Sequence, residues 1–252
     1  MPAHHLEAPR ILATLRRLHD RIGERFPGSG LGHVAADLLT VGDDTAELVA
    51  YLGRPNWPIR IAVGVVLALI GGVLAAAALS LRMPAGIDGF GAFVQAIESA
   101  INDLVFLGIA VFFLVSLENR IKRSRALWSL HRLRSVAHIV DMHQLTKDPE
   151  RLASPELDTA SSPTRSLTTP ELGRYLDYCS ELLSLISKLA ALHVQQFNDS
   201  VTLGAVNEIE GLCGSMSNKI WQKITLIGRT GQQTPPGSPA PTPPDRAPPK
   251  RR

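Results

Sequence analysis

Residues 61–81, "IAVGVVLALIGGVLAAAALSL", form a run of 21 residues without a charged side chain. As an α-helix this run is roughly 31 Å long, which matches the hydrocarbon core of a bilayer. A buried helix of a soluble protein rarely stays apolar on every side over such a length. The run therefore predicts a membrane-spanning helix.

A second apolar run covers residues 104–117, "LVFLGIAVFFLVSL", and has only 14 residues. It reaches the length of a span if the helix begins earlier, with Asn102 and Asp103 at the level of the lipid headgroups. A helix before it, within residues 83–99, is expected to lie in the outer interface, because its apolar residues recur at helical spacing.

The orientation of the two runs follows from the distribution of basic residues, because cytoplasmic ends of spans are enriched in Lys and Arg. Residues 82–103, between the runs, carry Arg82 as their one base against three acids. Bases gather before the first run and after the second: Arg54, Arg60, Arg120, Lys122, Arg123, Arg125, Arg132 and Arg134. We therefore expect a multi-pass protein of the plasma (inner) membrane with both termini cytoplasmic.

The segment after the second run predicts a stalk helix and then a cytoplasmic helical bundle. Apolar residues recur at spacings of four and three, as in packed helices, at Ala126, Leu130, Leu133, Ala137 and Val140. Asp148 and Pro149 end this helix, because a residue before proline disfavours helical geometry. Thr169, Pro170 and Glu171 predict the start of the next helix. Its apolar face is wide enough to need more than one partner.

The order of the last helices has two alternatives. The sequence "NDS" at residues 198–200 predicts a turn, and with it an antiparallel three-helix bundle. An uninterrupted helix over residues 170–227 would instead pair with other chains. Near the N-terminus a basic amphipathic helix either lies on anionic lipid or packs as a fourth member of the bundle, which we favour. A short helix near residues 44–52 would then lead to the first span.

Two groups of residues predict contacts within or beside the membrane. Small residues let helices approach closely in lipid, and they repeat every four positions in the first run at Gly64, Ala68, Gly72, Ala76 and Ser80. This ladder predicts a helix-packing surface, either for the second span of the same chain, which we favour, or for another copy. Glu98, Asn102 and Asp103 lie where acids could line the outer mouth of a cation pore. The plainer explanation is that Asp103 complements the helix dipole at the water boundary.

Residues 137–150, "AHIVDMHQLTKDPE", concentrate histidines and acids and raise the question of a metal site. His138 and Asp141 are three residues apart on a helix, and His193 of the next helix could join them as a weak candidate ligand set. The sequence favours a polar helix end instead. Since the phosphate-binding and HExxH motifs are missing as well, we expect neither a cofactor nor an enzyme.

The sequence thus predicts an all-α integral membrane protein: a two-span transmembrane hairpin with a cytoplasmic helical bundle. Its segments are N-terminal amphipathic helices (1–58), transmembrane helix 1 (59–82), a short external loop with the interfacial helix (83–99), transmembrane helix 2 (100–118), a cytoplasmic stalk (119–147), a flexible linker (148–169), a helical hairpin (170–228) and a Pro-rich disordered tail (229–252). Cys179 and Cys213 fall on core positions and are expected to be buried thiols.

The expected function follows from wide apolar helix faces without a catalytic constellation. We expect a non-catalytic inner-membrane scaffold or assembly protein that binds the lipid bilayer and forms a homo-oligomer or binds a cytosolic protein partner. The alternative is a small oligomeric cation channel or transporter component that uses the acids at the outer end of the second span. A net charge of only +3, without basic residues interleaved with aromatics, argues against a nucleic-acid partner.

Overall fold

The computed structural model describes residues 5–80, 90–147 and 167–232, the side chains at positions 73, 74, 76–80, 90, 92–97, 99, 100, 103 and 229–232 excepted. Within these ranges the chain is all-helical, without a strand. The helices follow in the order α1 (Ala8–Arg25), α2 (Gly30–Leu52), α3 (Trp57–Ser80), α4 (Phe90–Leu145), α6 (Thr169–Gln196) and α7 (Ser200–Gln232). Most of the expected linker and tail lies outside the described residues, as do residues 83–89 of the expected outer loop.

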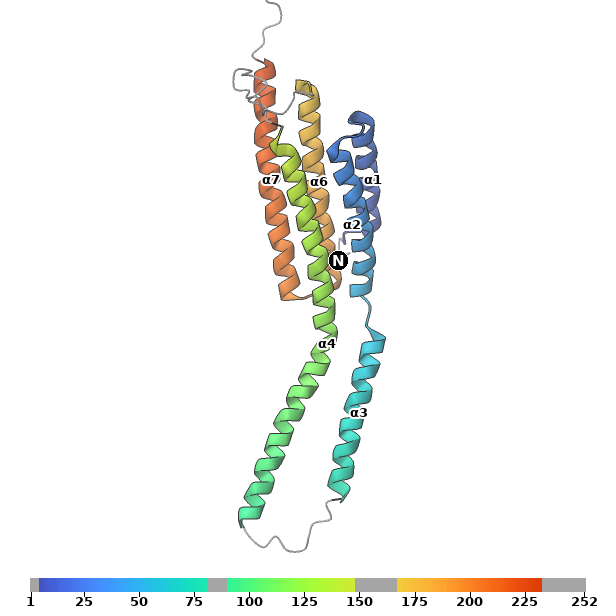
Figure 1. Ribbon diagram of the computed structural model, residues 1–252, viewed down its shortest axis with the longest axis vertical. Coiled ribbons are helices and arrows are strands. Elements are labelled where there is room, and N and C mark those ends of the chain that lie inside the picture. Colours follow the sequence, from blue (N-terminus) through green and yellow to red (C-terminus); the bar gives the residue numbers. More distant parts are fainter. Residues whose placement is uncertain (1–4, 81–89, 148–166, 233–252) are drawn as a thin grey trace, which may run out of the picture.

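Two helical stretches are long and apolar enough to cross a membrane, as judged from length and composition, one within Gly30–Gly72 and one within Leu104–Leu145. Figure 1 shows α3 and the first half of α4 extending side by side from one end of the molecule. We call α3 and residues 90–117 of α4 the apolar arms. Their apolar side chains face outward: Leu69, Leu104 and Phe112 are 64%, 68% and 76% exposed.

The other helices form a bundle at the opposite end of the molecule (Figure 1). In it α1, α2, α6, α7 and the second half of α4 pack around one hydrophobic core. α6 contacts the four other helices of the bundle, α1, α2, α4 and α7, because its apolar face is wide. The expectation that this wide face needs several partners is confirmed. The N-terminal helix also packs into the core, because Leu15, Leu18 and Ile22 of α1 are fully buried.

α2 is longer than the sequence predicts. It covers Gly30–Leu52, so the expectation of only a short helix near 44–52 is wrong. The hydroxyl of Ser29 accepts a hydrogen bond from the Gly32 N–H at 3.2 Å and caps the first turn. Glycine weakened the helical signal here, yet a Cβ at Gly42 would lie 2.8 Å from Leu12 Cδ2. Glycine at this position therefore lets α1 approach α2 closely.

α4 is a single helix of 56 residues, roughly 84 Å long. The expectation that the second apolar run continues as a stalk is confirmed. The separate interfacial helix is not observed, since residues 90–99 belong to the same helix as the apolar run. Residues 90–145 contain no proline, and the polar side chains near residue 102 do not interrupt the backbone hydrogen bonds of a helix.

The last two helices form an antiparallel hairpin, so the uninterrupted helix over residues 170–227 is excluded. α6 is capped by Thr168, one residue before the expected position: its backbone N–H and its hydroxyl donate to the Glu171 carboxylate at 2.8 and 2.7 Å. These hydrogen bonds lower the pKa of Glu171. At the start of α7, Asp199 accepts a hydrogen bond from the Thr202 N–H at 2.9 Å and caps the second helix of the pair.

Candidate functional site at the joint between bundle and arms

The candidate site begins with the break between α2 and α3. α2 ends at Leu52 and α3 starts at Trp57, so the residues between them connect the bundle to the first apolar arm. Pro55 lies within this connection and has no N–H to continue a helix. The break brings together the carbonyl end of one helix and the N–H end of the next. These ends carry opposite partial charges and leave backbone groups without helical partners.

Lys122 of α4 satisfies the carbonyl end of α2. Its Nζ donates to the backbone oxygens of Leu52 at 3.1 Å and Arg54 at 2.7 Å. Lys122 is only 7% exposed, so its charge is removed from bulk water and needs these acceptors. A cation at the C-terminus of a helix is also stabilised by the helix dipole. Lys122 therefore both caps α2 and attaches it to α4.

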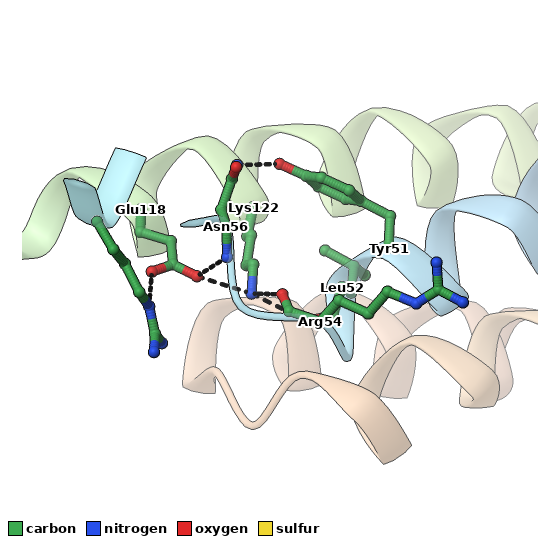
Figure 2. Close-up of polar contacts among 7 residues, drawn as sticks. Tyr51, Leu52, Arg54, Asn56, Glu118 and Lys122 are labelled. Carbon is green, nitrogen blue, oxygen red and sulfur yellow. Dashed lines mark hydrogen bonds and ion pairs between the residues drawn. The ribbon is translucent and has the colours of Figure 1, made fainter. Parts of the chain in front are cut away.

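Glu118, one turn before Lys122 on α4, satisfies the N–H end of α3. Its carboxylate accepts from the Asn56 N–H at 3.0 Å and from Arg60 Nε at 2.8 Å. It also forms an ion pair with Lys122 at 3.0 Å. Figure 2 shows both side chains reaching from α4 to the α2–α3 connection. One i,i+4 pair on α4 thus caps both sides of the break, and we call Glu118 and Lys122 the clamp.

Aromatic and polar contacts support the clamp on the bundle side. Asn56 Nδ2 donates to the Tyr51 hydroxyl at 2.6 Å (Figure 2). The guanidinium of Arg125 lies 4.8 Å from the centre of the Tyr51 ring, a cation–π distance. Tyr51 of α2 and Asn56 of the α2–α3 connection thus hold the end of α2 against α4.

A second ion pair attaches the α6–α7 turn to α4 close to the clamp. Arg123 donates from Nη2 and Nε to Asp199 at 2.6 and 3.0 Å. Burial would raise the pKa of Asp199, but the hydrogen bonds from Arg123 and Thr202 outweigh it and lower the pKa. Clamp and turn contacts together hold α2, α4 and the α6–α7 turn at one level of the molecule, directly beside the arms.

From the sequence alone, the basic residues near the arms are expected only to set the orientation of the spans. The structure pairs most of them with acids of the same chain: Arg60 and Lys122 with Glu118, Arg123 with Asp199, Arg132 with Asp44, and Arg134 with Glu208. The roles of Glu118 and Lys122 were therefore missed. Their i,i+4 spacing is a visible signal, but their partners in the α2–α3 connection are 58 to 70 residues away along the chain.

The structure does not bring the candidate metal ligands together. His138 is exposed on α4, and Asp141 accepts a hydrogen bond from Gln144 Nε2 at 2.7 Å. His193 is fully buried and lies against Ser129, with its Nε2 3.1 Å from the Ser129 hydroxyl. In the part of the chain that the structure describes, no three His, Cys, Asp or Glu residues are placed to hold a metal ion.

His193 belongs instead to a buried polar network that joins three helices. Its Nδ1 lies 3.1 Å from the Ala190 carbonyl, which can only accept, so Nδ1 carries the proton. Nε2 must then accept from the Ser129 hydroxyl, and the Ser129 oxygen accepts from the Thr45 hydroxyl at 3.3 Å. Burial lowers the pKa of His193, which agrees with this neutral tautomer. The network links α2, α4 and α6.

The described residues that were predicted to make contacts in the membrane are exposed in the single chain. Among the described residues, no atom lies within 4 Å of a Cβ built at Gly64 or Gly72, and Ala68 is exposed. Gly64 and Gly72 therefore have no close neighbour among the described residues, and a packing surface for the second span or for another copy stays a prediction. Glu98 and Asn102 are exposed on α4.

Three of the residues named in these predictions have no described side chain. The side chains of Ala76, Ser80 and Asp103 lie outside the described part of the structure.

The expectation of buried thiols is confirmed, because Cys179 and Cys213 are free and buried. Burial raises the pKa of Cys179 to about 12 and that of Cys213 to about 11. Neither thiol is therefore a nucleophile at neutral pH.

Comparison of the chain with protein-family models, with curated proteins and with solved structures finds no match.

Proposed function

We propose that the chain is a membrane-anchored scaffold: its apolar arms cross the plasma (inner) membrane, and its bundle stands on the cytoplasmic surface and associates with another copy or with a cytosolic protein. The observation that carries this proposal is the clamp. A flexible tether would let the bundle move freely above the membrane. Here a continuous α4 and the Glu118–Lys122 pair hold the bundle rigidly on the arms.

The cytoplasmic orientation is supported by charge. The clamp and its neighbours place Arg54, Arg60, Lys122 and Arg123 at the bundle end of the arms, whereas the opposite end carries acids such as Glu98. Cytoplasmic ends of spans favour Lys and Arg. Both termini then lie on the cytoplasmic side, since α1 and α7 belong to the bundle.

The buried polar groups of the bundle hold helices together, which favours a scaffold over an enzyme. Ser129 and His193 resemble a nucleophile with its base, but Ser129 is 5% exposed and His193 fully buried. Buried polar networks that are fully hydrogen-bonded specify how helices pack. The network of Thr45, Ser129 and His193 therefore sets the register of three helices and supports a rigid platform.

The test measures assembly in lipid. The full chain is extracted from its own membrane in polymer-bounded lipid particles, and the protein mass per particle is measured. A scaffold gives particles heavier than the 27.2 kDa chain, with a second copy or a companion protein in fixed ratio. Lys122→Met should reduce this association, because it releases the bundle, whereas Arg16→Gln, at the exposed ion pair with Asp43, should not.

Two outcomes would contradict the proposal. Particles that hold one chain and no companion would remove the scaffold. Ion flux through the protein in liposomes, abolished by Asp103→Asn, would favour the channel instead, because only a pore depends on the acids at the outer end of α4.

A further inference from the structure

α7 carries on its outer side a line of nine exposed residues without a charge. α7 lies at the edge of the bundle, packed against α6 and α4 (Figure 1). Val206, Ile209 and Cys213 are buried on its inner face. The outer positions recur at spacings of four and three and form what we call the α7 stripe: Ser200, Gly204, Asn207, Gly211, Gly214, Asn218, Trp221, Thr225 and Gly228.

The neighbouring helix shows that this stripe is unusual within the same bundle. The exposed side of α6 carries Arg174 and Lys188, and the partly exposed Asp177 and Glu181 beside them. Charged residues are the ordinary composition of a helix face that meets water. The α7 stripe has none over its whole length of 29 positions, so solvation alone does not explain it.

Glycine in the stripe points to a close neighbour that one chain does not supply. Gly204, Gly211 and Gly214 lie inside α7, where glycine is a poor helix former compared with alanine. Among the described residues, no atom lies within 4 Å of a Cβ built at any of the three. Gly42 has the opposite situation, because its missing side chain admits Leu12. The stripe glycines therefore have space that the bundle leaves empty.

The large apolar residues of α7 mark the same surface independently. Trp221 lies in the stripe and is 58% exposed. Val201 and Leu203, next to the start of the stripe on either side, are 48% and 45% exposed. In a two-stranded coiled coil these flanking positions are covered by the partner helix.

We propose that the α7 stripe pairs with the α7 stripe of a second copy in the same membrane. The nine stripe residues carry no charge and so meet their counterparts without like-charge repulsion, while the exposed Glu210 and Lys219 lie at the flanks of the stripe. Asn207 and Asn218 can each donate to and accept from their counterparts, since an amide offers both functions. The flanking Glu208 forms an exposed ion pair with Arg134 of its own chain. The inference rests on the proposed membrane anchoring and names the copy as the scaffold's partner.

The direction of the pairing follows from the anchoring. α7 runs along the bundle beside α4, and its first turn lies near the arms. Two copies in one bilayer point the same way, so their α7 helices are parallel and each stripe residue faces its own counterpart. Gly211 of the two copies then lie opposite each other, and the same holds for Asn218.

Disulfide crosslinking tests this register directly. Gly211→Cys and Asn218→Cys are introduced one at a time into the full chain and oxidised in membranes with copper phenanthroline. Each should give a disulfide-linked dimer, whereas Gly23→Cys should not. Gly23 is a matched control, because it is an exposed helical glycine with no described atom within 4 Å of its Cβ position. The unaltered chain serves as the control for disulfides formed by the native Cys179 and Cys213, which are buried.

A second variant separates pairing from folding. Gly211→Leu improves the helix propensity of α7 but fills the space of closest approach. It should leave the thermal unfolding of the bundle unchanged or raised, and it should lower the crosslinking of Asn218→Cys by about tenfold, the size expected for overpacking.

The outcomes are distinguishable from those for the proposed function. No crosslink at Gly211→Cys and Asn218→Cys, or full crosslinking in the presence of Gly211→Leu, would overturn the pairing. A dimer linked only between Asn207→Cys and Asn218→Cys would show an antiparallel arrangement and overturn it as well. If those results came with a companion protein in fixed ratio, the scaffold would stand and the α7 pairing would fall.

Discussion

The bundle and the apolar arms are both rich in apolar residues but arrange them in opposite ways. In the bundle Leu183 and Ile186 of α6 are fully buried, because apolar positions recur at spacings of three and four and meet those of other helices. In the arms Leu104 and Phe112 are 68% and 76% exposed, because apolar residues surround each helix. The difference teaches that the bundle supplies its own apolar environment, whereas the arms need one from outside.

The largest expected effect is on the core of the bundle. Leu183→Ala should lower the free energy of unfolding by roughly 2–5 kcal/mol, because it leaves a cavity in a close-packed core. Leu104→Ala in the arm should change it by less than about 0.5 kcal/mol. Unfolding followed by circular dichroism in lipid particles measures both. Equal losses would break the comparison, since they would make the arm part of the same packed unit.

The clamp, where the two regions meet, should give the next largest effect. Lys122→Met removes the donor of two backbone oxygens and one of the two cations that contact the nearly buried Glu118 carboxylate, which should cost about 2–3 kcal/mol. Glu118→Gln added to it should restore part of this loss, because the carboxylate that lost its ion pair with Lys122 is gone. Arg134→Gln, at an exposed ion pair, should cost at most about 0.5 kcal/mol. A cost for Lys122→Met as small as that of the control would show that the clamp does not join the regions.

Acid should destabilise the bundle through His193. Burial lowers the pKa of His193 in the folded state below its ordinary value of 6.5, so the unfolded chain binds the proton more readily. The stabilising contribution is complete above pH 6.5 and is lost as pH falls from there through the lowered pKa. Unfolding measured from pH 8 to 5 should show this loss. His138→Gln, on an exposed histidine, should keep the pH dependence, and His193→Gln should weaken it.

The smallest effects are expected at two glycines, one in each region. Gly42→Ala should cost about 1 kcal/mol, because the new Cβ would lie 2.8 Å from Leu12 Cδ2 in the bundle. Gly64→Ala in the arm should cost nothing in bundle unfolding, because no described atom lies within 4 Å of its Cβ position. A clear loss for Gly64→Ala would mean that the small-residue ladder is packed, and would sharpen the search for a second copy there.

The sequence predicts well what depends on local periodicity. The arms, the buried faces of α1 and α6, and the turn before Ser200 all follow from spacing and capping residues. The first half of α2 is not predicted, because glycines at 30, 32 and 42 weaken the helical signal, although those at 30 and 42 make room for a close side chain.

The candidate site depended on information that periodicity does not carry. Nothing local connects Asn56 to Glu118, or Ser129 to His193, although each pair is joined by a hydrogen bond in the folded chain. Such contacts between distant segments are set by how whole helices pack. For the same reason His193 was assigned to a weak ligand set with His138, whereas its neighbour in space is Ser129.

The central claim is that both arms cross the membrane and leave the bundle on the cytoplasmic side, and cysteine labelling in intact cells tests it most directly. Lys188→Cys reports from the exposed side of α6, and Gly89→Cys from the segment between the arms. With a membrane-impermeant maleimide, we predict labelling at position 89 in intact cells and at position 188 only after permeabilisation. Labelling at position 188 in intact cells would contradict the account.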